Sequence, residues 1–231
     1  MFKNYLIKLH QKSFKENEMN IFSLLDKNPN AKLLDLGCDE GSFTLRLANK
    51  IGTKQIYGID IVDERIKESK EKGIKIVKSD LNKKLPFEDN FFDVIHANQV
   101  IEHLFDVDLF AEEIYRILKP NGYAIISTEN LSSWHNLFAL FMGHQAFSQH
   151  ISSKYHIGNK ISPHHGEDLI LKSWTHNKIF TYKGLKEFFK IHNFKNGKIL
   201  GAGHYLTLNF FPIFSKLDPI HTHFITIKVK K

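Results

Sequence analysis

Short β-rich runs alternate with helical patterns along most of the chain. The runs rich in Ile, Val, Leu, Tyr and Phe predict five strands, at Ala31–Leu36, Gln55–Ile61, Ile74–Ser79, Phe91–Ala97 and Gly122–Thr128. Before the last of them, Phe110, Ile114 and Ile117 recur at helical spacing, and Lys119-Pro120-Asn121-Gly122 predicts the end of this helix and a turn. Such alternation is typical of a parallel sheet with helices on both faces.

The two ends of the chain extend this pattern. Residues 1–25 predict an amphipathic helix, with apolar positions at Phe2, Tyr5, Leu6 and Leu9 and lysines elsewhere. Either this helix packs over the sheet edge or the ligand cleft, or it lies on an anionic membrane. Near the other end, Thr181–Asn193 predicts a helix, and β-like runs around Lys198–Leu208 and Ile220–Val229 bring the sheet to seven strands.

Residues 130–177 break the alternation. They contain Trp134, Trp174 and seven of the 14 histidines, with no clear strand pattern. Irregular histidine spacing and the absence of a nearby cysteine argue against a zinc cluster. We therefore expect this segment to be an insertion that covers a substrate within a single domain spanning residues 1–231.

Composition narrows the class of protein. A chain of 231 residues that is 42% hydrophobic and contains 20 Phe can bury the core of one globular domain. Its apolar runs are far shorter than the ~20 residues that span a bilayer. The one cysteine, Cys38, excludes an internal disulfide, and no cleavable signal peptide is recognisable at the start. A cytoplasmic location is the simplest expectation.

The charge balance is moderately basic. There are 32 Lys and Arg against 25 Asp and Glu, a net charge of +7. The lysines are distributed along the whole chain, which favours a solvated surface over an RNA-binding or anionic-membrane surface.

A glycine turn after the first strand is the sharpest local signal. The apolar stretch from Leu33 runs into Asp35-Leu-Gly37-Cys-Asp-Glu-Gly41, and a helical pattern follows. Glycine lets the backbone turn tightly and approach a ligand. Asp60 ends the second strand, where a carboxylate can accept both hydroxyl protons of a ribose. The G-x-G-x-x-G dinucleotide pattern is absent, and carboxylates around the turn would repel a pyrophosphate, so we expect an uncharged or cationic nucleoside.

These residues resemble those of the class I S-adenosylmethionine-dependent methyltransferases. The resemblance rests on the acidic glycine motif, on Asp60, on Ser79-Asp80-Leu81 and on the stretch from Leu85-Pro86-Phe87 to Asp93, although Asp39 stands where many members have glycine. It implies a Rossmann-like α/β fold with strand order 3-2-1-4-5-7-6, the last strand antiparallel, and S-adenosylmethionine as cofactor. It also implies cofactor contacts at Asp35, Gly37, Cys38, Gly41, Asp60, Ile61, Asp80, Leu81 and Asn98.

Gln99-Val-Ile-Glu102-His103 follows the fourth strand. It resembles the Glu-x-x-Glu-His stretch of ubiquinone-biosynthesis O-methyltransferases and small-RNA 2′-O-methyltransferases, which can bind a divalent metal. Here Gln99 replaces the first carboxylate, which weakens a site for a hard cation, so we expect no metal. We expect His103 and the distant His176 to be the catalytic candidates, with His103 as a general base or a structural residue.

The acceptor is the least defined part of the prediction. Trp134, His135 and Asn136 follow the carboxyl end of the fifth strand, where open α/β sheets bind ligands, although Trp134 is equally well explained as a core residue. Likeness to envelope-associated members favours methyl transfer to an oxygen or nitrogen of a small molecule or cell-envelope precursor. An RNA ribose 2′-O-methyltransferase and an inactive methyltransferase-fold binding protein are the alternatives.

Overall fold

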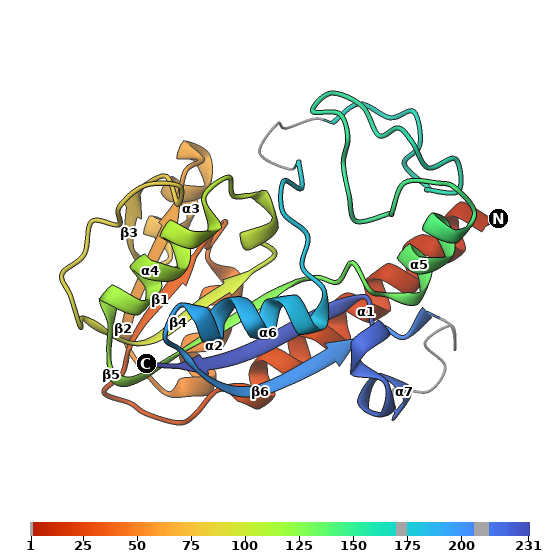
Figure 1. Cartoon of the computed structure of the whole chain (residues 1–231). Helices are drawn as coiled ribbons and strands as arrows, with labels where there is room; N and C mark the ends of the chain where they lie inside the picture. Colours follow the sequence, from red (N-terminus) through yellow and green to blue (C-terminus); the bar gives the residue numbers. More distant parts are fainter. Residues whose placement is uncertain (1, 170–174, 206–212) are drawn as a thin grey trace.

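A seven-stranded mixed sheet lies at the centre of the computed structural model, which describes residues 2–169, 175–205 and 213–231 (Figure 1). The strand order is β3-β2-β1-β4-β5-β7-β6; β1 to β5 pair in parallel, and β7 runs antiparallel to β5 and β6. The strands are β1 (Lys32–Leu36), β2 (Gln55–Asp60), β3 (Lys75–Lys78), β4 (Phe92–Asn98), β5 (Leu118–Glu129), β6 (Lys195–Ala202) and β7 (Phe224–Lys230). This order and the antiparallel last strand confirm the predicted fold.

Helices cover both faces of the sheet. They are α1 (Phe2–Leu24), α2 (Ser42–Ile51), α3 (Asp63–Glu71), η1 (Ile101–His103), α4 (Val107–Ile117), α5 (Trp134–Phe141), α6 (Tyr182–Ile191), α7 (Ile213–Leu217) and η4 (Pro219–His221). Alternate residues of β1 face opposite sides, as the pleat requires. Leu34 packs in a core with α4 and α6, whereas Leu33 packs in a second core with α1 and α2. No helix within the described ranges is both long and apolar enough to cross a bilayer.

Helix α1 is fixed to the sheet by both apolar and polar contacts. Ile21 and Leu24 are buried in the core that α1 shares with α2. Asn17 is also buried, and its Oδ1 accepts hydrogen bonds from Ser127 Oγ on β5 (2.9 Å) and Thr226 Oγ1 on β7 (2.7 Å). The second half of α1 is therefore part of the folded core.

Element boundaries differ from the sequence prediction in two places. β5 begins at Leu118, directly after α4, because the expected turn at residues 119–122 is accommodated as an irregularity within the strand, with Asn121 at φ +68°. The last two strands also differ from their predicted bounds. β6 runs from Lys195 to Ala202, so it begins and ends earlier than the predicted Lys198–Leu208, and β7 starts at Phe224 rather than Ile220. Leu208 itself lies outside the described residues.

The segment from 130 to 177 leaves the sheet at the carboxyl end of β5. Asn130 forms an isolated β-bridge with Phe180, α5 follows, and the described chain continues irregularly with a second β-bridge between Tyr155 and Asp168. In Figure 1 it forms a lobe above the sheet, beside the N-terminal end of α1. Trp174 lies outside the described residues.

The hydrogen bonds of Asn17 predict that this side chain contributes to the free energy of unfolding. Asn17→Ala should lower the free energy of unfolding by about 2 kcal/mol, because it leaves two buried hydroxyl groups without their acceptor. Urea unfolding measures this directly. Met19→Ala, on the exposed side of the same helix, should change stability by no more than about 0.5 kcal/mol. Equal effects of the two substitutions would contradict the proposed anchoring of α1.

Candidate active site

The glycine turn lies between β1 and α2 and is held against β2. The backbone N–H groups of Gly37 and Cys38 both donate to the carbonyl of Ile59, at 2.9 and 3.0 Å. Gly37 has φ +70°, and a Cβ there would come within 2.7 Å of Val100 Cγ2. Glycine is therefore required at this position both for the backbone conformation and for the close packing.

Asp39 occupies the position where many family members have glycine. Its φ of +50° is left-handed, a conformation that aspartate tolerates better than most residues. Its side chain pairs with Arg65 at 2.8 Å, and its backbone N–H donates to Asp60 Oδ2 at 2.9 Å. Aspartate in place of glycine at position 39 is therefore compatible with the left-handed turn.

Asp60 lies at the carboxyl end of β2, beside the glycine turn. Its Oδ1 accepts hydrogen bonds from the backbone N–H groups of Ile61 (2.8 Å) and Val62 (3.0 Å). Ile61 is an apolar side chain that is 53% exposed immediately after this carboxylate. Leu81, from the loop after β3, is partly buried against the core. A carboxylate, a glycine turn and an exposed aliphatic side chain therefore meet at one edge of the sheet.

Asp35 points away from this edge. It is buried, and its two carboxylate oxygens accept hydrogen bonds from Thr44 Oγ1 on α2 (2.5 Å) and contact His96 Nδ1 on β4 (2.7 Å). These bonds connect β1, α2 and β4 beneath the turn. Both carboxylate oxygens of Asp35 are thus bonded within the protein, and its contact with a cofactor stays a prediction.

Cys38 is buried as well, as expected for a residue whose role is packing. Its Sγ would lie 2.7 Å from a Cβ at Gly58, so the thiol fills the space above that glycine on β2. Burial, with a smaller contribution from Asp35, raises the pKa of the Cys38 thiol to about 12. A thiol that stays protonated at neutral pH is a poor nucleophile.

Asp80 and Asn98 lie in neighbouring loops of the same edge. Asp80 Oδ1 accepts hydrogen bonds from the backbone and side-chain N–H groups of Asn82 (2.9 and 3.1 Å). Asn98 ends β4, and its Oδ1 accepts from Asn17 Nδ2 at 3.1 Å. The next residue, Gln99, has φ +56°, a strained backbone of the kind that concentrates at functional sites.

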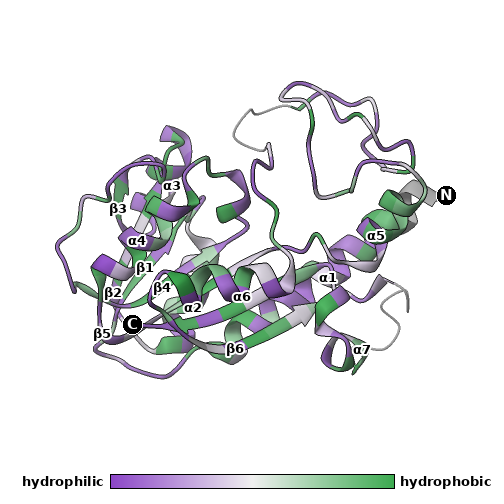
Figure 2. Cartoon of the chain, viewed as in Figure 1, coloured by the Kyte–Doolittle hydropathy of each residue, from purple (hydrophilic) through white to green (hydrophobic). Residues whose placement is uncertain are grey.

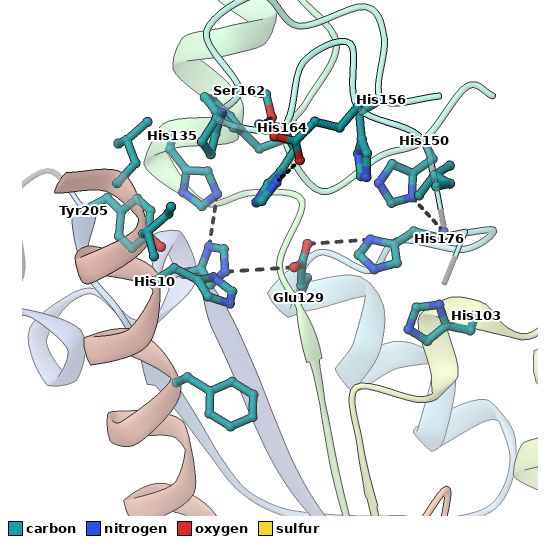
Figure 3. Close-up of a pocket in the computed structure, with 18 of the residues that line it drawn as sticks. His10, His103, Glu129, His135, His150, His156, Ser162, His164, His176 and Tyr205 are labelled. Carbon is teal, nitrogen blue, oxygen red and sulfur yellow. Dashed lines mark hydrogen bonds and ion pairs between the residues drawn. The ribbon is translucent and has the colours of Figure 1, made fainter. Parts of the chain in front are cut away.

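A cavity of about 950 Å³ lies under the lobe formed by residues 130–169, and none of the predicted cofactor residues lines it. Its walls combine apolar side chains with an unusual number of imidazoles (Figure 3). Eight histidines contribute: His10, His103, His135, His150, His156, His164, His176 and His223. They come from α1, η1, α5, the lobe and the start of β7, so the cavity depends on the whole fold.

Glu129, the last residue of β5, lies at the centre of this cavity between two groups of histidines (Figure 3). Its Oε2 is 3.7 Å from His176 Nδ1, and its Oε1 is 4.0 Å from His223 Nε2. His223 Nδ1 is in turn 3.1 Å from His135 Nε2. Neither separation is a hydrogen bond: His176 Nδ1 is bonded to the Ser148 carbonyl at 2.7 Å, and His223 Nε2 has no hydrogen-bond partner among the described residues, so the Glu129 carboxylate faces both imidazoles without bonding to either.

Most of the cavity histidines are electrically neutral. Burial lowers the pKa of His103 and of His150 to about 4 and that of His135 to about 3. Burial also lowers the pKa of His10, His156 and His223, and neighbouring imidazoles lower several of these pKa values further. At neutral pH such side chains accept or donate hydrogen bonds without carrying charge.

Glu102, His103 and His176 come together at one side of the cavity. One donor atom from each lies within 4.8 Å of the others, which is close enough for all three to bind one metal ion. Glu102 is fully buried; its Oε2 accepts from Thr128 Oγ1 at 2.9 Å, and its Oε1 has no hydrogen-bond partner among the described residues. The sequence prediction that His176 is the distant partner of His103 agrees with this arrangement, and their rings lie 4.9 Å apart.

The three residues predicted to contact the acceptor do not lie together. His135 lines the cavity. Trp134 instead donates from Nε1 to Asp218 Oδ2 (2.9 Å), and Asn136 is buried and donates to the carbonyl of Asn130 (3.0 Å). Successive residues of a helix point about 100° apart, so three consecutive side chains of α5 cannot all face one cavity.

Four cavity residues escaped the sequence prediction: His10, Glu129, Tyr205 and His223. Of these, only Glu129 could have been predicted from the sequence, because it stands at the carboxyl end of a parallel strand, where such sheets bind ligands. The other three are brought in by the packing of α1 and β7.

A seven-stranded sheet of this order, with a glycine turn after β1 and an acidic residue ending β2, defines the class I S-adenosylmethionine-dependent methyltransferases. The methyltransferase domain model matches residues 27–189, and the chain belongs to this family, whose cofactor is S-adenosylmethionine.

Two curated relatives and one solved structure agree with this assignment. The chain is 34% identical over 107 residues to 2-phytyl-1,4-naphtoquinone methyltransferase of Trichormus variabilis, covering 42% of this chain and 46% of that protein. It is 31% identical over 119 residues to demethylmenaquinone methyltransferase of Staphylococcus aureus, covering 48% and 49%. The chain thus spans about half the length of these relatives. A methyltransferase structure from Thermotoga maritima, described as a possible histamine N-methyltransferase, covers 100% of this chain and 98% of its own, with a TM-score of 0.62 and 16% identity.

Burial of Glu102 predicts that the free energy of unfolding depends on pH. The pKa of this carboxyl is raised from 4.5 to about 7, mainly by burial. Between these values the folded state retains a proton that the unfolded chain has lost, so stability should fall as pH rises, by roughly 3 kcal/mol in total. Urea unfolding in the presence of a chelator measures this loss.

Glu102→Gln cannot titrate and should lack this part of the pH dependence. Glu112→Gln, an exposed position on α4, should keep the wild-type slope. An identical slope for wild type and Glu102→Gln would mean that Glu102 ionises normally.

Proposed function

We propose that the protein transfers a methyl group from S-adenosylmethionine to a small-molecule acceptor held in the histidine-lined cavity. The observation that carries this proposal is the position of Glu129 and His176, 3.7 Å apart inside a cavity at the carboxyl ends of β4 and β5. Open α/β sheets bind their ligands at this edge. The cofactor strands β1 and β2 end at the same edge, so donor and acceptor would meet there.

The residues around the glycine turn fit the cofactor. The turn at Gly37 has no room for a Cβ, because Val100 packs against it, and this close packing would hold the turn in shape beside the cofactor. Asp60 would hold the ribose hydroxyls, Ile61 and Leu81 would pack against the adenine, and Asp80 would accept from its amino group. Gly41, Cys38 and Asn98 complete the proposed surroundings, with Asp35 supporting the turn from below. When bound, S-adenosylmethionine supplies a methyl group already activated on a sulfonium sulfur.

The chain's own groups would then orient the acceptor and remove its proton. The acceptor hydroxyl or nitrogen would lie between Glu129 and the imidazoles of His103 and His176, and Glu129 would take the proton directly or through His176. The neutral histidines would exclude water and orient the acceptor by hydrogen bonds. Apolar wall residues such as Phe14 and Phe147 would contact its hydrophobic part.

The acceptor class that these walls favour is a molecule with an apolar body and one reactive hydroxyl or nitrogen. A small metabolite and a lipid-linked envelope precursor both meet this description. The names of the two curated relatives add quinone-type rings to the acceptors worth testing. We propose that the reaction takes place in the cytoplasm and that residues 130–177 act as the acceptor cover.

A transfer assay with labelled S-adenosylmethionine tests the proposal. The panel should contain hydroxyl-bearing and amine-bearing small molecules, reduced naphthoquinones and a short RNA. Label appearing in one of the small molecules is the expected result. Label in the RNA would instead support ribose methylation, and no transfer to any of them despite cofactor binding would support a binding protein of this fold.

Cofactor affinity tests the assignment of Asp60. Asp60→Ala should weaken binding of S-adenosylmethionine by about 1.5 to 3 kcal/mol, because two charged hydrogen bonds to the ribose are lost. Isothermal calorimetry gives this value. The matched control is Asp63→Ala three residues later, whose exposed carboxylate pairs with Lys78 and should contribute only a few tenths of a kcal/mol. Unchanged affinity in Asp60→Ala would remove the ribose assignment.

Turnover tests the assignment of Glu129. Glu129→Gln should lower kcat on the best acceptor by about 100-fold or more, the usual effect of losing a general base, and leave cofactor affinity unchanged. Glu187→Gln, exposed on α6, should retain wild-type kcat. A chelator should not change the rate, since the proton is taken by Glu129. Abolition by chelator and recovery with zinc would instead assign Glu102, His103 and His176 to a metal.

A further inference from the structure

Exposed apolar side chains gather at one end of the molecule. α5 presents Leu137, Phe138, Leu140 and Phe141 to solvent, and Phe141 is 87% exposed. α7 presents Ile213, Phe214 and Leu217. Figure 2 shows α5 as a mostly hydrophobic ribbon at the end of the molecule that also contains the N-terminus. Patches of this kind on a folded protein mark interaction sites.

The apolar side chains of α5 and α7 belong to one surface. Trp134, the first residue of α5, donates to Asp218 Oδ2, the residue that follows α7, and stacks on His221 at 4.4 Å. The irregular chain after α5 adds the exposed Ile151 and Ile157. We call the exposed apolar residues of α5, α7 and this chain the apolar end.

The net positive charge of the protein is concentrated in the segments that form or border the apolar end. Residues 1–15 contain four lysines, residues 130–166 contain two, and neither segment contains an aspartate, glutamate or arginine. Six of the seven net positive charges therefore lie in these two segments, and the rest of the chain is nearly neutral. The lysines are distributed along the whole chain, but the acidic residues are not, so these two segments have an excess of positive charge.

Two acidic residues near the apolar end, Asp218 and Glu167, are already engaged. Asp218 accepts from Trp134 and also contacts His204 Nε2 (3.1 Å) and His221 Nδ1 (2.8 Å). Glu129, Glu167 and Asp168 line the cavity, and Glu167 pairs with His164 at 2.8 Å, whereas Asp168 is exposed. Lysines 8, 15, 154 and 160 are exposed, as is Lys216 on α7.

We propose that the apolar end docks on the surface of an anionic lipid bilayer. Phe and aliphatic side chains from α5 and α7 would enter the boundary between headgroups and acyl chains, and the surrounding lysines would contact anionic headgroups. An anionic bilayer surface complements both the exposed apolar side chains and the exposed lysines beside them.

Other occupants fit less well. A symmetric contact between two copies would place the same lysine-rich segments against each other, and like charges repel. An RNA would pair with the lysines but would leave Leu137, Leu140, Ile151 and Ile157 against a charged backbone, and neither segment offers an arginine.

The cavity lies close to this docking surface. Leu6 and Ile7 of α1 and Phe147, which follows α5, line it. A hydrophobic acceptor would then enter from the bilayer; this step alone rests on the proposed function, whereas docking does not.

Vesicle binding by the full chain, without cofactor or acceptor, tests the docking. We expect flotation with vesicles that contain phosphatidylglycerol and much less with phosphatidylcholine alone, and we expect added salt to weaken the binding. Phe138→Ser/Phe141→Ser should lower the partition coefficient by about tenfold or more, and Lys154→Gln/Lys160→Gln by about fivefold for each lysine.

Matched controls separate docking from misfolding. Leu217 on α7 and Ile191 on α6 are both 72% exposed, but only Leu217 belongs to the apolar end. Leu217→Ser should weaken vesicle binding, and Ile191→Ser should not. All variants should keep the wild-type cofactor affinity, which shows that they fold.

Three outcomes would overturn the inference. Absence of wild-type binding to anionic vesicles is the first, and equal loss in Leu217→Ser and Ile191→Ser is the second. The third is a wild-type dimer in solution that becomes monomeric in Phe138→Ser/Phe141→Ser while neither protein binds vesicles. Each of these results leaves methyl transfer untouched, since the transfer assay is run without lipid.

Discussion

The reversal of strand order between β1 and β4 is the constraint on which the site depends. β2 and β3 lie on one side of β1, and β4, β5, β7 and β6 lie on the other. Loops that leave the carboxyl ends of β1 and β4 therefore diverge and leave a crevice between them. The glycine turn, Asp60, Asn98 and Glu129 all belong to loops or strand ends at this edge, so their proximity follows from topology before any side-chain contact is made.

Buried hydrogen bonds stabilise the carboxyl edge of the sheet. Asp35 joins β1, α2 and β4 through Thr44 and His96, and Asn17 joins α1 to β5 and β7. Unpaired buried polar groups are costly, so each network stabilises only the arrangement that satisfies it. Burial also lowers the pKa of six of the eight cavity imidazoles, and Glu129 lies between the two groups of histidines.

The sequence was most informative where backbone geometry restricts the residue type. Gly37 and Gly41 have positive φ, and Asp60 must end its strand beside them, so the pattern predicted the turn, whereas the sheet order followed from the resemblance to the methyltransferases. It was least informative about side-chain direction. Asp35 faces inward because Thr44 and His96 are within reach, and Trp134 faces Asp218 because a helix rotates consecutive residues apart. His10 and His223 are more than 200 residues apart in the chain, yet their rings lie 5.2 Å apart. Such contacts depend on how α1 docks, which no local pattern encodes.

Basic, acidic and apolar side chains are distributed unevenly between the two ends of the molecule. The lysine-rich first half of α1 and the lobe from residue 130 share one end, while the cofactor edge is surrounded by Asp39, Asp60 and Asp80. A cationic cofactor is attracted to the acidic edge, and an anionic surface is attracted to the opposite charge at the apolar end. The cavity lies between them, with imidazoles that carry little charge. If the proposed cofactor site and the proposed docking surface are combined, a methyl group would move from the acidic edge of the sheet toward the apolar end, and the acceptor would approach from the opposite side.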